Sequence, residues 1–106
     1  MIPKKLFKKL SDNWGYPAET LECDAVMRIY DPQSRWQCWL LAINPDDINQ
    51  IYCIIDGETV ECCEWTFREL WQAYGADGEP PSVDVEFRPI QAKILYKKLL
   101  ERGTYD

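Results

Sequence analysis

The 106-residue sequence predicts an α+β fold with a single antiparallel β-sheet of about five strands, an N-terminal helix, a helix after the fourth strand and a C-terminal helix. Three observations lead to this prediction. Apolar residues alternate in the middle of the chain, as they do in strands with one buried face. In the flanking segments they recur every three or four residues, as in amphipathic helices. Grouped strands bounded by helices, without strict strand–helix alternation, are typical of α+β domains.

The first two segments predict a helix and a loop. Residues 3–10 form a short amphipathic pattern with Pro3 in the first turn, leucines four residues apart and lysines on the outer face. Residues 11–21 are rich in turn formers and predict an ordered loop, which Trp14 and Tyr16 hold against the core.

Four strands are expected next. Residues 22–30 alternate in polarity and predict one strand with a single buried face. Residues 36–43 are continuously apolar, so we expect a strand at the centre of the sheet or covered on both faces. Residues 51–55 and 59–64 flank Asp56-Gly57 and predict a hairpin, because glycine tolerates the positive φ of tight hairpin turns.

The remaining chain predicts two helices and a short strand. Thr66 and Glu69 fit a capping box that starts a helix ending at Gly75. Residues 83–87 predict a short strand, and residues 89–102 a second amphipathic helix. The core stripe of the first helix is Phe67, Leu70, Trp71 and Tyr74, and the second helix carries Ile90, Ile94, Leu95 and Leu99.

Composition predicts one domain over residues 1–106, with no cofactor and no metal. The five cysteines are odd in number, contain no Cys-x-x-Cys pair and have no histidine to complete a zinc site, so we expect reduced thiols. Cys62-Cys63 is the one candidate for thiol chemistry, but neighbouring strand residues point to opposite faces. The chain has no long apolar run and no secretory leader, which favours a cytoplasmic protein.

The charges are segregated along the chain. Residues 11–90 contain sixteen acidic residues, four arginines and no lysine, a net charge of −12. Both ends are basic, and the whole chain carries −6. Because few carboxylates can be buried without partners, the folded protein is expected to present a negative field, and its partner is expected to be basic.

Several short segments carry a family resemblance that covers nearly the whole chain. They are residues 2–6, 28–32, 36–39, 45–47, 67–70 and 87–89. With these segments the chain resembles a bacterial family catalogued as domain of unknown function 2958. The resemblance implies carriage on plasmids, prophages and other mobile elements, near anti-restriction and DNA-transfer genes. It implies no catalytic residues. The family's glycine-rich segment is shortened here to residues 56–58, and the helix over residues 91–102 is an addition.

Charge and resemblance together predict a small non-enzymatic inhibitor of a host nucleic-acid-handling or defence complex, of the anti-CRISPR or anti-restriction type. Its carboxylates would act as a DNA mimic and occupy a basic surface, for example on a Cas effector or restriction enzyme. The expected partner-binding residues are Asp46, Asp47, Asp56, Glu58, Glu61 and Glu64, with Trp36 or Trp39 as an apolar anchor. The two tryptophans face opposite sides of a strand, so an exposed anchor and a buried core residue both stay open.

Three alternatives are weighed against this hypothesis. The lysine-bearing terminal helices allow direct binding to nucleic acid, although the −12 body would repel a duplex. An enzyme using paired carboxylates would need a desolvated cleft, and the chain lacks histidine and any phosphate-binding loop. Asp46-Asp47 fits a divalent cation, but after Asn44-Pro45 a tight turn is favoured.

Overall fold

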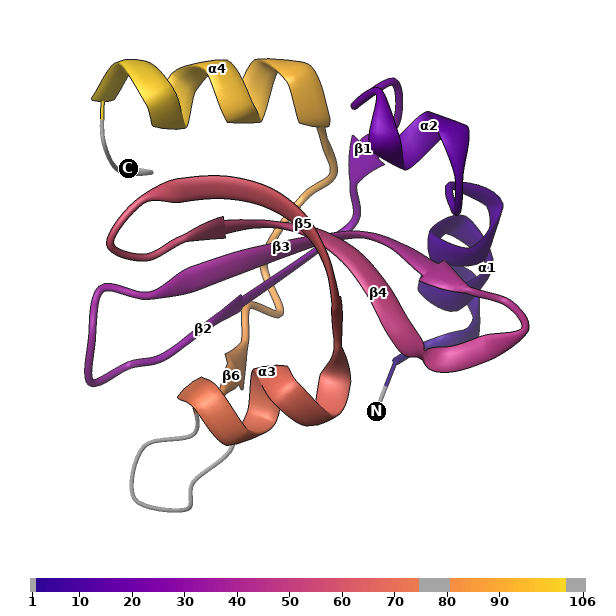
Figure 1. Cartoon of the computed structure of the whole chain (residues 1–106), viewed down its shortest axis with the longest axis horizontal. Coiled ribbons are helices and arrows are strands. Elements are labelled where there is room, and N and C mark those ends of the chain that lie inside the picture. Colours follow the sequence, from indigo (N-terminus) through magenta and orange to yellow (C-terminus); the bar gives the residue numbers. More distant parts are fainter. Residues whose placement is uncertain (1, 75–80, 103–106) are drawn as a thin grey trace.

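The computed structural model describes residues 2–74 and 81–102, and it has the predicted α+β architecture (Figure 1). Five antiparallel strands form the main sheet in the order β5-β4-β3-β2-β6. These strands are β2 (Met27–Tyr30), β3 (Gln37–Asn44), β4 (Asp47–Asp56), β5 (Val60–Thr66) and β6 (Ser82–Val83). A separate two-stranded ladder joins β1 (Asp24–Ala25) to β7 (Ile90–Gln91). The helices are α1 (Lys4–Asp12), α2 (Tyr16–Glu19), α3 (Phe67–Tyr74) and α4 (Ala92–Arg102).

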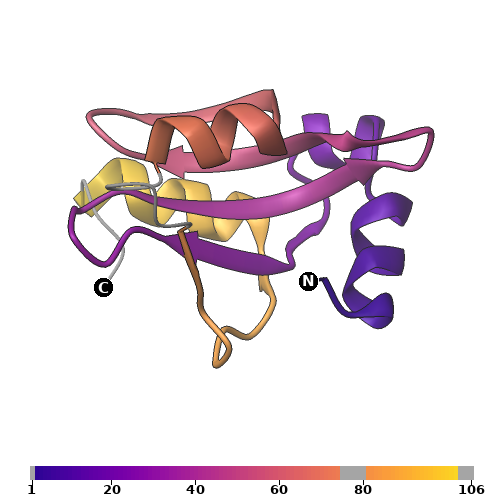
Figure 2. The ribbon, with the colours of Figure 1, turned by 90° about the horizontal axis from the view of Figure 1, so that it is seen from below.

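Strand β3 is the middle strand of the sheet, as its continuous apolar sequence predicted. Every residue from Gln37 to Ile43 is buried. Helices α1 and α3 cover one face, where their apolar side chains pack against Cys38 and Leu40. Helix α4 covers the other face, where its residues pack around Trp39, and Figures 1 and 2 show α3 and α4 on opposite sides of the sheet. A strand between two covered faces has no polar side to show to solvent.

A β-bulge in β3 decides which residues face which core. Leu40 pairs with Cys53 and Ala42 pairs with Tyr52, so Leu41 is an extra residue without a partner in β4. Leu41 and Ala42 therefore pack into the same core, the one under α4. After this shift, Ile43 returns to the face covered by α1 and α3. Such a bulge changes the alternation of side chains by one position.

The expected single strand over residues 22–30 is wrong in its continuity. It is divided into β1 and β2 around Val26. Ala25 belongs to the core under α4, whereas Met27 and Ile29 belong to the core under α1 and α3. The break allows β1 to leave the main sheet and pair with β7.

Two predicted boundaries at the C-terminal side are also corrected. The strand expected over residues 83–87 is limited to β6, because the Asp84 carboxylate accepts a hydrogen bond from the Glu86 amide and closes a turn. Helix α4 begins later than expected, at Ala92, and buries Leu95 and Leu99, whereas Ile94 is 47% exposed. The predicted end of the preceding helix at Gly75 lies outside the described residues.

The segment expected as a loop before the first strand is partly helical. Helix α1 continues to Asp12, and α2 forms a single helical turn from Tyr16 to Glu19. Trp14 packs against the core under α4, as predicted. The prediction for Tyr16 is wrong, because this side chain is 71% exposed.

The hairpin between β4 and β5 is confirmed, but the expected role of its glycine is wrong. Asp56 pairs with Val60, and residues 57–59 form the turn. Among the described glycines the positive φ belongs to Gly15, not to Gly57. At Gly57 an added Cβ would lie 3.3 Å from Cδ1 of Trp36. The turn thus uses glycine to let the backbone approach the indole closely.

The cap of α3 is formed by the predicted residues. The Glu69 amide donates to the Thr66 hydroxyl at 3.1 Å. The Thr66 hydroxyl in turn donates to the Glu69 carboxylate at 2.9 Å. Thr66 is also the last residue of β5, so the cap sets the point where the strand becomes a helix. Phe67, Leu70 and Trp71 then point into the adjoining core.

Candidate functional site

Asp56 is removed from the expected binding surface by a buried polar network. It is 4% exposed, and its carboxylate accepts a hydrogen bond at 2.9 Å from Nε2 of Gln37, the residue directly across the β3–β4 ladder. The Gln37 Oε1 atom accepts a hydrogen bond at 2.9 Å from Arg28 Nε. Arg28 also forms an ion pair at 3.0 Å with Asp84. Asp56 therefore has a structural role, and its assignment to the partner surface is wrong.

The apolar anchor expected at Trp36 or Trp39 is also wrong. The two indoles face opposite sides of β3, as predicted. Trp36 is 5% exposed and Trp39 is 0% exposed. Both faces of the sheet are covered by helices, so each tryptophan belongs to a core and neither is presented at the surface.

Asp46 and Asp47 are exposed at the predicted turn, which consists of Pro45 and Asp46, and Asp47 is the first residue of β4. The Asn44 side chain accepts a hydrogen bond from the Asp46 amide at 2.8 Å, and the Asp47 carboxylate accepts one from the Asn49 amide at 3.1 Å. Such side-chain hydrogen bonds to the backbone are typical of turns. Within the described ranges, no group of three or more potential ligands is arranged to hold a metal ion.

Glu58, Glu61 and Glu64 are exposed and lie at one border of the sheet, and we call this set the acidic edge. Strand β5 is the outermost strand, with β4 on its inner side. Glu61 pairs with Ile55 and Glu64 pairs with Tyr52, so their side chains point to opposite faces. The ion pairs formed by the described residues do not include any of the three.

The expected acidic residues thus form two groups instead of one sheet face. Asp46 lies in the turn before β4 and Asp47 is the first residue of that strand, whereas Glu58 lies in the turn after it. Ten residues of β4 separate the turns, which corresponds to about 30 Å at a rise of about 3.3 Å per residue. One compact partner contact would use one group or the other.

The basic helices do not form one continuous surface either. Helix α1 packs on the core shared with α3, whereas α4 packs on the opposite face. Lys8 pairs with Asp12 and Lys93 pairs with Glu22. These exposed ion pairs within the chain fit solvated helix faces better than a joint nucleic-acid site.

All five cysteines are free, as the sequence predicted. Cys62 and Cys63 face opposite cores. Burial, followed by the charge of Asp24, raises the pKa of Cys23 to about 11, and burial, followed by Cys63, raises the pKa of Cys62 to about 11. A hydrogen bond with Cys53, followed by burial, also raises the pKa of Cys63. Protonated thiols are weak nucleophiles, so their environment does not favour thiol catalysis at neutral pH.

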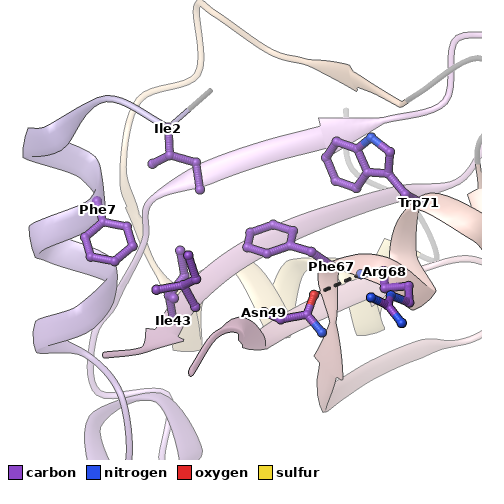
Figure 3. A pocket seen from close by; sticks show the side chains of 8 residues that line it. Ile2, Phe7, Ile43, Asn49, Phe67, Arg68 and Trp71 are labelled. Atoms are coloured by element: carbon purple, nitrogen blue, oxygen red, sulfur yellow. Dashed lines mark hydrogen bonds between the residues drawn. The ribbon is translucent and has the colours of Figure 1, made fainter. Parts of the chain in front are cut away.

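An apolar groove of about 680 Å³ lies between α1 and α3, and sequence reasoning missed it (Figure 3). Ile2 and Phe7 form one wall, Phe67 and Trp71 form the other, and Ile43 lies between them. Sequence patterns assigned most of these residues to the core. The sequence held no clear signal for the groove. Its one unusual lining residue is Ile48, an isoleucine of β4 that the structure shows to be exposed.

Comparison with known proteins gives no match: no family model, no curated protein and no solved structure matches the chain. The resemblance to the mobile-element family therefore stays a prediction. In the described part of the chain, the helices are all too short or too polar to cross a membrane.

Proposed function

We propose that the protein is a non-enzymatic acidic binding protein of a phage, prophage or plasmid. It would inhibit a host nucleic-acid-handling or defence complex, of the anti-CRISPR or anti-restriction type, by occupying a basic surface of that complex. The observation that carries this proposal is the acidic edge: Glu61 and Glu64 on the outermost strand and Glu58 in the turn before it are exposed and are outside the ion pairs of the described residues.

The physical mechanism is electrostatic competition. Along an extended strand, the Cα atoms of residues three apart are separated by about 10 Å, and the sheet holds Glu61 and Glu64 at this spacing on opposite faces of the edge. A partner's lysines and arginines would pair with these carboxylates instead of with phosphates. Opposite charges accelerate association, and salt screens them, so binding should weaken as ionic strength rises.

The cell compartment and the absence of catalysis are parts of the same proposal. Five free thiols fit the reducing cytoplasm. The described carboxylates at the acidic edge are exposed along the outer border of the sheet, whereas paired catalytic carboxylates need a cleft in which one of them is desolvated.

The partner can be identified by affinity purification from a bacterial host lysate with salt-graded elution. The key variant is the triple reversal E58K/E61K/E64K, measured against the captured partner. We expect the dissociation constant to rise at least about tenfold, because like charges then face each other. The matched control is E19K/D24K/E86K, which makes the same change in net charge at three exposed carboxylates outside both acidic groups.

The comparison of the two variants decides the assignment. Loss of binding in the edge variant alone supports the acidic edge. Equal loss in both variants, or full binding by the edge variant, would refute it. Charged residues on an outer strand also prevent edge-to-edge aggregation. Lysine serves that purpose as well as glutamate, so the E58K/E61K/E64K variant tests partner binding without removing this protection.

A gel-shift assay tests the remaining alternative of direct binding. The separation of α1 from α4 on opposite faces leads us to expect no shift of single- or double-stranded DNA at physiological salt. A robust shift would instead favour a nucleic-acid-binding accessory protein.

A further inference from the structure

The groove between α1 and α3 has the size and lining of a small-molecule site. Its volume of about 680 Å³ falls within the range of about 300–1,000 Å³ that holds a drug-sized ligand. Its walls come from two helices on the same face of the sheet, and strand β3 provides Ile43 at the base (Figure 3). The side chains of Ile2, Phe7 and Phe67 are only partly buried, so the groove leaves apolar surface in contact with water.

The aromatic wall is held in a fixed arrangement. Phe67 and Trp71 are one helical turn apart on α3, and their rings meet edge to face, with centroids 5.9 Å apart and planes at 78°. This contact restrains both rings. A preformed apolar wall lowers the cost of ordering the site when a ligand enters.

The charged residue in the lining is a cation. Arg68 lines the groove from the first turn of α3, and its side chain is exposed. None of the ion pairs among the described residues involves Arg68. The opposite wall belongs to α1, which carries four lysines and has no acid in its first turn.

Asn49 adds a second hydrogen-bond donor at the groove. Its Oδ1 atom accepts a hydrogen bond from the Arg68 backbone amide at 3.2 Å (Figure 3). The amide nitrogen of the same side chain therefore remains as its donor group. The nearby acids have local partners: the Asp47 carboxylate accepts from the Asn49 backbone, and the Glu69 carboxylate accepts from Thr66.

From this geometry we infer a ligand site for a small amphipathic carboxylate. Its apolar body lies between Phe7 and the Phe67–Trp71 wall, and its carboxylate binds the Arg68 guanidinium and the Asn49 amide nitrogen. Guanidinium and carboxylate match each other as paired donors and acceptors, which favours an anionic head group over a hydroxyl. This site is separate from the acidic edge and does not depend on the proposed function.

The probes are decanoate, below its micelle concentration, and the uncharged 1-decanol. Binding is followed in isotopically labelled full-length protein by backbone amide chemical shifts, which report the position as well as the affinity. We expect shifts centred on residues 43, 48–49 and 67–71, and tighter binding of decanoate than of 1-decanol.

The decisive variant is Arg68→Gln, with Arg35→Gln as a matched control at another exposed arginine. Loss of the charged pair should weaken decanoate binding about tenfold in Arg68→Gln and bring it to the level of 1-decanol. The control should stay within about twofold of the unmodified protein, and so should the edge variant E58K/E61K/E64K. Equal affinity for the two probes, shifts away from the groove, or no binding of either probe would overturn the inference.

Discussion

The polar network around Gln37 provides the most informative test of how the sheet is held together. Its amide connects two charged groups: Nε2 donates to the Asp56 carboxylate, and Oε1 accepts from Arg28 Nε, both at 2.9 Å. We consider Gln37→Met, which keeps the length and approximate volume of the side chain and removes both polar atoms. The variant leaves the Asp56 carboxylate without this donor while it is 4% exposed.

The expected loss of stability is about 3 kcal/mol. A hydrogen bond to a charged group contributes about 1.5–3 kcal/mol, and a buried charge that loses its partner has the full desolvation cost. Asp56 accounts for about 2 kcal/mol of the loss. Arg28 accounts for about 1 kcal/mol, because its side chain is 22% exposed and retains the ion pair with Asp84. For a domain of about 100 residues, the melting temperature should fall by at least about 12 °C.

The assay is urea unfolding at pH 7, with Gln50→Met as the control. Gln50 accepts a hydrogen bond at 2.8 Å from the Asn44 amide, and both groups are uncharged, so its loss should cost about 1 kcal/mol. The double variant Q37M/D56L should be more stable than the sum of the two single effects predicts, because both polar partners are then absent. A loss below about 1 kcal/mol in Gln37→Met, or additive single effects, would refute the network.

Two further predictions concern the cap and the thiols. Thr66→Ala removes the hydroxyl that accepts from the Glu69 amide and should lower the free energy of unfolding by about 1 kcal/mol; an unchanged melting temperature would contradict the cap. For Cys23 and Cys62, the pKa is raised in the fold from 9.0 to about 11. The thiols lose protons first in the unfolded chain, so their contribution to stability is complete below pH 9 and is lost as the pH rises towards 11. Urea unfolding under reducing conditions at pH 8 and pH 10 should show this decline, and C23A/C62A should reduce it; the same decline in both proteins would contradict the assignment.

Local sequence patterns predicted those elements whose formation depends on neighbouring residues. The cap at Thr66 and Glu69, the turn at Asp46 and the described part of the stripe on α3, from Phe67 to Trp71, each involve residues within four positions of one another. The period-two pattern over residues 22–30 failed because tertiary pairing of β1 with β7 divides the strand. The predicted role of Gly57 was also wrong, since the glycine is required by contact with Trp36, which lies just before β3 and 21 positions away in sequence.

The candidate sites depended more strongly on the fold. Charge segregation correctly indicated exposed carboxylates at Glu58, Glu61 and Glu64. It did not show that Asp56 is buried, because the Gln37 donor is nineteen residues away in sequence and meets it only across the ladder. The groove could not be predicted from apolar residues alone. The same hydrophobic pattern is found on a helix face that lines an open groove and on one that is fully packed into the core.

The sequence by itself determined the fold class, the central position of β3 and the presence of a strongly acidic middle region, because hydrophobic periodicity and charge are properties of short stretches. Only the tertiary structure decided which side chains reach the surface. Burial depends on register between distant strands, and the single extra residue at Leu41 reassigns the neighbouring side chains between the two cores. The apolar groove likewise depends on α1 and α3, two helices far apart in the sequence, lying on the same face of the sheet.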